Sequence, residues 1–208
     1  MTTPLGSLSV DAREGRRVTV SRRTRETDVT LTLDVDGTGT ADVHTGVGFY
    51  DHLLGSFAHH GLFDLVIRVA GDLEVDEHHT VEDVALCLGG ALAEALGDRA
   101  GIARFGDAAV PMDEALATAV VDVGGRPYAV LDLPFRGERI GALPTQLVEH
   151  ALEAFAGTSG VTLHVRASGR NDHHVAEAAF KALARALRAA ATADPRRAGV
   201  ASTKGSLG

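Results

Sequence analysis

Hydrophobic and polar residues alternate along the first part of the chain, after a small and polar stretch over residues 1–15. Alternation is typical of strands with one buried face, whereas apolar residues three or four positions apart indicate a helix. Gly97 marks the expected end of one helix. The pattern predicts strands around 18–20, 29–35 and 41–44, a helix over 49–59, a strand over 65–69 and a helix over 78–96.

The second part of the chain repeats this order of elements. Gly124 and Gly125 indicate a turn between two of its strands. The pattern predicts strands over 102–110, 116–123 and 127–133, a helix over 145–156, a strand over 161–165 and a helix over 173–191.

Individual residues repeat together with the elements. One motif occurs as Asp51-His52-x-Leu54-x-x-Phe57-Ala58 and as Glu149-His150-x-Leu152-x-x-Phe155-Ala156. A second motif occurs as His78-His79-x-x-Glu82 and as His173-His174-x-x-Glu177. The second motif follows the first by 26 residues, from His52 to His78, and by 23 residues, from His150 to His173. Two motifs in the same order at nearly equal spacing indicate an internal duplication.

We therefore expect an α+β fold of two β-β-β-α-β-α halves related by a pseudo-twofold axis, with helices packed against mostly antiparallel sheets. No linker-like stretch separates the halves, so they should pack as one unit. The expected division is a flexible N-terminal arm over 1–15, a first half-repeat over 16–99, a second half-repeat over 100–193 and a C-terminal tail over 194–208.

Composition narrows the class of protein. The 208 residues carry a net charge of −8 and are 45% hydrophobic, with a single cysteine, Cys87. A mixed, acidic charge pattern argues against generic nucleic-acid binding, and one cysteine excludes an internal disulfide. No apolar run is long enough to span a bilayer, and the N-terminus lacks the apolar core of a signal peptide. We therefore expect a cytoplasmic protein.

The repeated histidines indicate metal binding. Six of the ten histidines occupy repeat-matched positions. Adjacent residues of a helix point about 100° apart, so the two histidines of a pair cannot easily hold the same ion. An arrangement with two ions is more natural: each ion binds one histidine of each pair, and residues of neighbouring helices complete its ligands. The expected ligands are His52, His78, His79, Glu82, His150, His173, His174 and Glu177.

The type of ligand indicates a catalytic role for the metal. Imidazole with carboxylate suits Mn, Fe, Zn, Co or Ni, and the lack of cysteine ligands argues against a closed structural zinc site. Positions left open on the ions point to substrate binding or catalysis. The unmatched histidines, His44, His59, His60 and His164, are expected to be structural or surface residues.

Several basic residues lie near turns and ends and could bind an anion. Lys181 follows Glu177 by four residues and so projects toward the metals. Arg104, Arg126 and the tail segment Ala201-Ser202-Thr203-Lys204-Gly205 could form a phosphate site. The alternative for the tail is a disordered basic segment.

Five segments together resemble a known family, and they span the chain from about Arg17 to Lys204. The motifs are Gly48-Phe49-Tyr50-Asp51-His52-Leu53-Leu54, His59-His60-Gly61-Leu62-Phe63-Asp64-Leu65, Asp76-Glu77-His78-His79-Thr80-Val81-Glu82-Asp83, Gly169-Arg170-Asn171-Asp172-His173-His174-x-x-Glu177 and Ser202-Thr203-Lys204-Gly205. They resemble the imidazoleglycerol-phosphate dehydratases of histidine biosynthesis, in the monofunctional form, because the chain is too short for a fused phosphatase.

The resemblance implies a duplicated fold of the ribosomal protein S5 domain 2-like type, two Mn²⁺ ions per subunit, and a twenty-four-subunit shell with metal sites at subunit interfaces. The eight residues expected to bind metal fall on the family's metal ligands. Glu26 falls on an acidic substrate contact, and Arg104, Arg126, Lys181, Ser202 and Lys204 fall on substrate and phosphate contacts. The family often has Gln where this chain has Ser56, which puts a direct substrate contact there in doubt.

The chemistry implied is dehydration of D-erythro-imidazoleglycerol phosphate to imidazole acetol phosphate. The C–H to be lost has no carbonyl beside it and is barely acidic. A metal-bound imidazolate could expel the neighbouring hydroxyl, giving a diazafulvene-like intermediate with a more acidic C–H. Glu26 is the candidate acid–base residue, and a pure hydrogen-bond acceptor is its alternative role. A metal-storage shell and a dinuclear metallohydrolase remain competing hypotheses.

Overall fold

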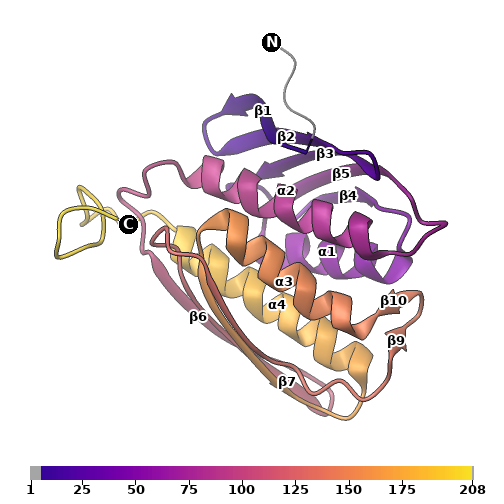
Figure 1. The fold of residues 1–208 in the computed structure, drawn as a ribbon. Helices are drawn as coiled ribbons and strands as arrows, with labels where there is room; N and C mark the ends of the chain where they lie inside the picture. Colours follow the sequence, from indigo (N-terminus) through magenta and orange to yellow (C-terminus); the bar gives the residue numbers. More distant parts are fainter. Residues whose placement is uncertain (1–5, 208) are drawn as a thin grey trace.

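The computed structural model describes residues 6–207. Its elements form four layers, in which two layers of helices lie between two sheets (Figure 1). The first half contains β1 (Leu8–Glu14), β2 (Arg17–Arg23), β3 (Thr27–Asp34), β4 (Ala41–His44), α1 (Gly48–Gly61), β5 (Asp64–Gly71) and α2 (His78–Leu96). The second half contains β6 (Phe105–Met112), β7 (Ala115–Asp122), β8 (Tyr128–Asp132), β9 (Arg139–Ile140), β10 (Leu143–Pro144), α3 (Thr145–Ser159), β11 (Thr162–Ser168) and α4 (Asp172–Ala191).

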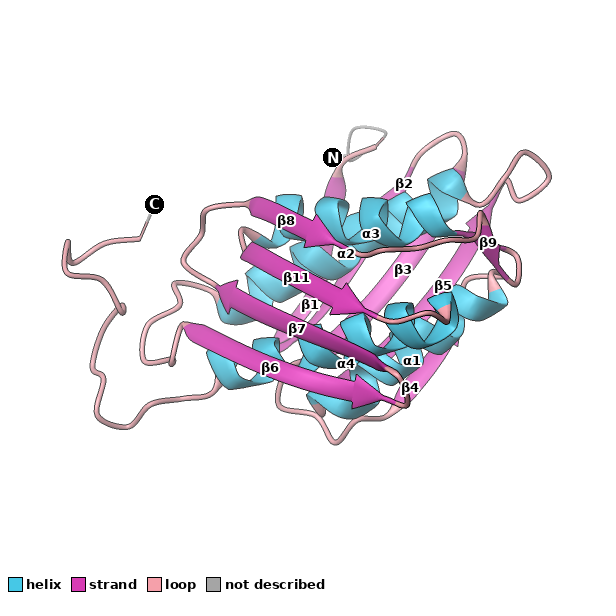
Figure 2. Cartoon of the chain, turned by 90° about the horizontal axis from the view of Figure 1, so that it is seen from below, coloured by secondary structure: helices cyan, strands magenta, loops and turns pink. Residues whose placement is uncertain are grey.

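The two large sheets share one topology. The first has the strand order β1-β2-β3-β5-β4 and the second has the order β6-β7-β11-β8, which is seen face-on in Figure 2. Apart from β1, the two orders correspond strand for strand. In each sheet one pair is parallel, β4 with β5 and β8 with β11, and the other pairs are antiparallel. The predicted α+β class and the duplicated order of elements are confirmed.

The helices bury the apolar face of each sheet and meet each other at the centre. Helix α2 packs on α3 and on β3, while α4 packs on α1, β6 and β7. Strand β3 shows the alternation that the sequence predicts, with Val29, Leu31 and Leu33 buried. Gly89 lets α2 and α3 approach closely, because a Cβ there would meet Phe155 O at 2.5 Å. No helix within the described residues is long and apolar enough to cross a membrane.

Three segments differ from the sequence prediction. Residues 8–14, expected to belong to a flexible arm, form β1, which pairs with β2 and packs Leu8 against the core, while residues 1–5 lie outside the described part. The strand predicted from residue 102 begins at Phe105, because Arg104 has a φ of 72° and interrupts the extended backbone. The short β9–β10 hairpin was not predicted.

This hairpin connects the N-terminal ends of the two helices that carry the histidine pairs. Arg139 Nη2 donates to Glu77 Oε1, just before α2, at 2.6 Å. The backbone N–H of Gly137 donates to Asp172 Oδ2, at the start of α4, at 2.7 Å. The N–H of Arg136 also lies 3.1 Å from both oxygens of Asp172, so the segment just before the hairpin is held to the start of α4 by more than one bond.

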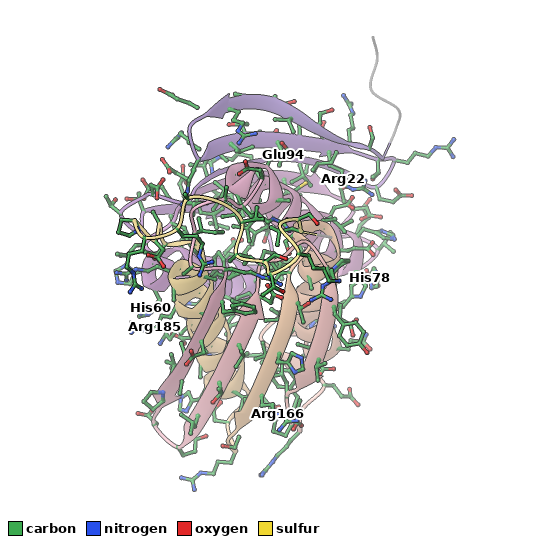
Figure 3. The ribbon with its side chains drawn as sticks, turned by 90° about the vertical axis from the view of Figure 1, so that its left-hand side faces the viewer. Arg22, His60, His78, Glu94, Arg166 and Arg185 are labelled. Carbon is green, nitrogen blue, oxygen red and sulfur yellow. The ribbon has the colours of Figure 1, made fainter. Side chains whose placement is uncertain are left out.

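A buried carboxylate joins α2 to the first sheet. Asp83 follows Glu82 on α2 and accepts from Arg22 Nε of β2 at 2.7 Å. Thr27 Oγ1 of β3 donates to its second oxygen. The Asp83 side chain is only 5% exposed, and Figure 3 places Arg22 beside the first sheet. Helix α2 is thus fixed to both strands that flank Glu26.

We predict that Asp83→Ala lowers the free energy of unfolding of the metal-stripped protein by about 3 kcal/mol, because it leaves a largely buried guanidinium without its partner. Asp28→Ala is the matched control, since Asp28 pairs with the next arginine of β2, Arg23, at 3.5 Å and is half exposed. It should cost less than about 1 kcal/mol. Urea denaturation followed by circular dichroism measures both, and equal losses would contradict the anchoring role.

Candidate active site

One group of potential metal ligands lies between α1 and α4, and we call it the α1–α4 group. It consists of His52 from the first half and His173 and Glu177 from the second, with ligand atoms within 4.8 Å of one another. Glu177 Oε2 lies 2.9 Å from His52 Nε2 and 3.2 Å from His173 Nε2. Phe49 packs against the His173 ring with 4.8 Å between centroids. The side chain of Asn171 caps α4 by accepting from the backbone N–H of His173, and this bond fixes His173 at the start of the helix.

The second group mirrors the first and lies between α2 and α3, and we call it the α2–α3 group. It consists of His78, Glu82 and His150, again within 4.8 Å of one another. His150 Nε2 lies 3.3 Å from Glu82 Oε1, and the rings of His78 and His150 stack with centroids 4.8 Å apart. Each group therefore combines a single histidine from one half with a paired histidine and a glutamate from the other half.

The second histidine of each pair, which we call an outer histidine, belongs to neither group. The ring of His79 is turned 84° from that of His78, and the ring of His174 is turned 87° from that of His173. The expected set of one histidine from each pair at each ion is therefore not assembled within one chain. The two histidines of each pair do point in different directions, as the helix geometry predicts.

Each outer histidine has its Nδ1 beside a carboxylate. His79 Nδ1 lies 3.0 Å from Asp72 Oδ2, and His174 Nδ1 lies 2.8 Å from Glu114 Oε2. Hydrogen bonds from His174 and from the N–H groups of Asn171 and Arg170 lower the pKa of Glu114 to about 2. The hydrogen bond to Asp72 raises the pKa of His79. The sequence analysis missed Asp72 and Glu114, since both lie on other elements at no fixed spacing from the histidines.

Glu177 is the most buried member of the two groups. Burial of its carboxyl group opposes ionisation, but hydrogen bonds from Lys181 and His52 outweigh this and lower its pKa to about 2. Lys181 Nζ lies 2.7 Å from Glu177 Oε1, as expected for residues four apart on a helix. The group thus holds an anionic oxygen ready for a cation, with a lysine beside it.

The donor set fits a divalent transition metal. Imidazole nitrogens are borderline ligands and carboxylate oxygens are hard ligands, and Mn, Fe, Zn, Co and Ni accept the combination. Each group supplies two imidazoles and one carboxylate, which leaves positions for further ligands. The arrangement can therefore hold a cation that also binds another molecule.

Glu26 lies in the turn between β2 and β3, on the side of the α2–α3 group. Its backbone O accepts from Asp72 N at 3.1 Å, so it neighbours the carboxylate that holds His79. Its side chain is exposed. Glu26 is therefore accessible to a molecule bound near His79.

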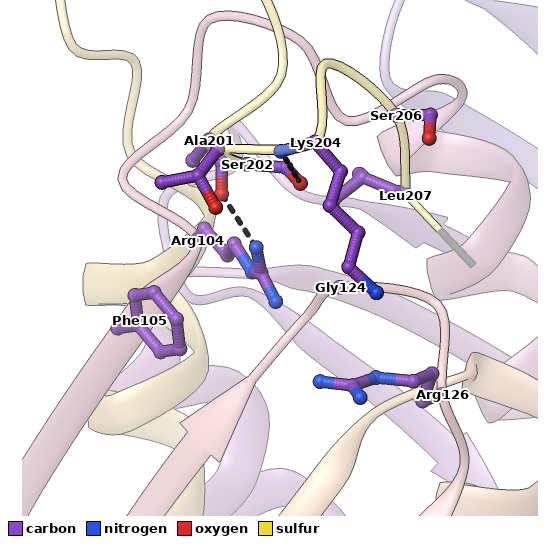
Figure 4. A pocket seen from close by; sticks show the side chains of 10 residues that line it. Arg104, Phe105, Gly124, Arg126, Ala201, Ser202, Lys204, Ser206 and Leu207 are labelled. Carbon is purple, nitrogen blue, oxygen red and sulfur yellow. Dashed lines mark hydrogen bonds between the residues drawn. The ribbon is translucent and has the colours of Figure 1, made fainter.

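A pocket of about 330 Å³ lies at the other end of the molecule, and Figure 4 shows its cationic side chains. Lys204, Arg104 and Arg126 all border it, together with Ser202. Arg104 is partly committed, because its Nε and Nη2 donate to Asp122 at 2.6 and 2.8 Å and its Nη1 donates to Ala201 O. The Arg126 side chain is 68% exposed. The tail is thus held by Arg104 and adds Lys204 to a cationic pocket.

The pocket and the two ligand groups lie at opposite ends of α4. His173 is in the first turn of this helix, whereas Arg104 N donates to Ala190 O near its end. The intervening residues span about 25 Å at 1.5 Å per residue. The structure therefore brings Lys181 to the ligand groups but does not bring Arg104, Arg126, Ser202 or Lys204 there within one chain.

The remaining residues that the sequence analysis singled out lie outside the two ligand groups. His44, His59 and His164 are exposed, which agrees with the expected surface role. The pKa of His60 is lowered by burial and by Lys181, and Figure 3 shows His60 near Arg185, across the helix layers from His78. Ser56 Oγ is buried and has no hydrogen-bond partner within the described residues.

Known proteins resemble this chain over nearly its full length. The sequence pattern of the imidazoleglycerol-phosphate dehydratase family matches residues 45–187. A relative from Methanoculleus marisnigri with that name is 56% identical over 188 residues, covering 90% of this chain and 97% of the relative. Another, from Methylorubrum extorquens, is 55% identical and covers 92% of this chain and 100% of the relative.

Two solved structures share the fold. Imidazoleglycerol-phosphate dehydratase from Staphylococcus aureus superposes with a TM-score of 0.75 at 36% identity, covering 80% of this chain and 95% of that one. The enzyme from Pyrococcus furiosus, solved in complex with (S)-C348, superposes with a TM-score of 0.78 at 36% identity, covering 90% and 99%.

Proposed function

Because the chain belongs to the imidazoleglycerol-phosphate dehydratase family, whose members are hydro-lyases of histidine biosynthesis, we propose that it converts D-erythro-imidazoleglycerol phosphate to imidazole acetol phosphate at a two-metal site. The observation that carries the proposal is the pair of matched ligand groups, His52, His173 and Glu177, and His78, Glu82 and His150. Family membership favours this enzyme over a storage shell or a metallohydrolase.

The metal site proposed here is completed between copies of the chain. Each ligand group would hold one Mn²⁺, and an outer histidine, His79 or His174, of another copy would add its Nε2. Support comes from the outer rings, whose Nδ1 atoms are engaged by Asp72 and Glu114. A metal would bind through Nε2, and at His174 it would replace the contact of 3.4 Å that this atom makes with Asn171 Nδ2. Each ion would then have three imidazoles and one carboxylate, with positions left for substrate.

The phosphate site also requires a second copy. The separation of about 25 Å along α4 prevents the Lys204 pocket from serving the ligand groups of its own chain. Phosphate would be bound by Arg126, Lys204 and Ser202, with the free N–H groups of Arg104, and the imidazole would lie at the ligand groups of a neighbouring chain. We therefore propose that the protein works as an assembly, of twenty-four copies as the family resemblance implies.

The chain's own residues would handle the protons. A divalent cation held by the ligand groups would stabilise the imidazolate form of the substrate ring, and the ring proton and the neighbouring hydroxyl would leave together as water. Glu26 would accept the proton from the next carbon, and the resulting enol becomes the ketone when a proton returns to the carbon that lost its hydroxyl. Lys181, fixed by Glu177, would add a cation close to the departing hydroxyl.

We predict that chelator-stripped protein loses turnover of imidazoleglycerol phosphate and regains it when Mn²⁺ is added. Stripping should also lower the mass measured by light scattering, because the outer histidines no longer share an ion with another chain. Metal content is verified in the same samples by mass spectrometry. Full turnover in verified metal-free protein would contradict the proposed chemistry, and an unchanged mass would contradict the shared site.

A second prediction separates phosphate contacts from metal ligands. Lys204→Ala should raise KM about tenfold to a hundredfold without changing metal content or mass, because a charge-assisted contact contributes roughly 1.5–3 kcal/mol. Arg196→Ala is the matched control, since this tail arginine is 89% exposed and does not border the pocket. His78→Asn should instead lower the metal content. Normal kinetics for Lys204→Ala would remove the tail from the phosphate site.

A further inference from the structure

The carboxylates that hold the two outer histidines come from different places in the repeat. Glu114 lies in the turn between β6 and β7, whereas Asp72 follows β5. Strand order makes the β6–β7 turn equivalent to the β2–β3 turn, which carries Glu26. Each half therefore has a glutamate in the same hairpin, but only in the second half is it the Nδ1 partner of the outer histidine.

Glu114 is fixed on both of its oxygens. Oε1 accepts from the N–H groups of Asn171 and Arg170 at 2.8 and 3.1 Å, and Oε2 lies 2.8 Å from His174 Nδ1. Its side chain is 22% exposed. Because the carboxylate can only accept, His174 must carry its proton on Nδ1, which makes Nε2 the acceptor of the ring. Asn171 Nδ2 lies 3.4 Å from this Nε2, which agrees with that tautomer, and a metal would take the place of the amide.

Asp72 does the same for His79 from a different backbone position. Its N–H donates to Glu26 O at 3.1 Å and its O accepts from Val75 N at 2.8 Å, so its backbone is held on both sides. Its side chain is 17% exposed and Oδ2 lies 3.0 Å from His79 Nδ1. Asp72 thus occupies the role at His79 that Glu114 has at His174.

We propose that Glu114 and Asp72 are positioning residues that set the tautomer and ring orientation of His174 and His79, and that Asp72 thereby leaves Glu26 free to act on substrate. This inference rests on the proposed two-metal function. The two hairpin glutamates have divided their tasks: Glu114 orients a ligand, and Glu26 faces the substrate. Carboxylates that orient metal-binding histidines change metal affinity by 10–100-fold when replaced.

Glu114→Gln is the sharpest test, because the two backbone N–H groups require the amide oxygen on their side. The amide NH₂ then faces His174 Nδ1, which must become an acceptor, and the ring proton moves to Nε2. If Glu114 served only the stability of the fold, the change would leave Mn²⁺ affinity unaltered. We expect Mn²⁺ affinity, measured by calorimetry and Mn²⁺ spectroscopy, to fall about tenfold or more, with a smaller mass in light scattering.

Three further variants complete the design. Asp72→Ala should weaken Mn²⁺ binding by a similar factor. Glu26→Gln should keep the Mn²⁺ affinity and mass of the unaltered protein while turnover falls. Glu14→Gln, at the exposed end of β1, is the matched control and should bind Mn²⁺ normally. The thermal transition of each metal-free variant confirms that it folds.

These measurements distinguish the positioning roles of Glu114 and Asp72 from the two-metal function. Unchanged Mn²⁺ affinity in Glu114→Gln and Asp72→Ala overturns the positioning roles, and loss of Mn²⁺ binding in Glu26→Gln overturns the division of tasks. Failure of the unaltered protein to bind Mn²⁺ would instead contradict the two-metal function itself.

Discussion

The angle of about 100° between adjacent residues of a helix determines how this molecule is organised. Each histidine pair stands in the first turns of its helix, so its two rings cannot face the same point. The first ring of each pair turns inward, toward a helix of the other half, and forms a ligand group with a glutamate one turn later. The second ring turns away and is held by a carboxylate from another element. In the proposed function, a chain built in this way would contain two incomplete metal sites, and its two outer histidines would complete sites on other chains.

Duplication explains why the incomplete sites match. The two halves pack through α2 on α3 and α1 on α4, so every group draws on both halves. His52 reaches the pair of the second half, and His150 reaches the pair of the first. The same duplication left a glutamate in each hairpin, Glu26 and Glu114, whose surroundings have since diverged. The cationic pocket lies about 25 Å away along α4, and in the proposed function a second chain would bring it to the ligand groups.

Local pattern was enough to predict most of the fold. Strand alternation, helical spacing and the repeated motifs gave the order of elements and both ligand-bearing helices, because these depend on residues close in the sequence. The repeat indicated that His52 and His150 belong with the histidine pairs, but it did not show which pair each of them meets. The sequence could not reveal Asp72 and Glu114, which meet the histidines only through tertiary packing. Three further features were not predicted. Arg104 donates hydrogen bonds to Asp122, its left-handed backbone shortens β6, and β1 pairs with β2.

Sharing of each metal between chains through an outer histidine can be seen in a crystal structure of the Mn²⁺-loaded protein, with anomalous data collected at the manganese edge. We expect two manganese peaks per chain, one at each ligand group, with Nε2 of His79 or His174 from another chain bound to each. Peaks whose protein ligands all come from a single chain, or with both histidines of one pair on the same ion, would contradict it.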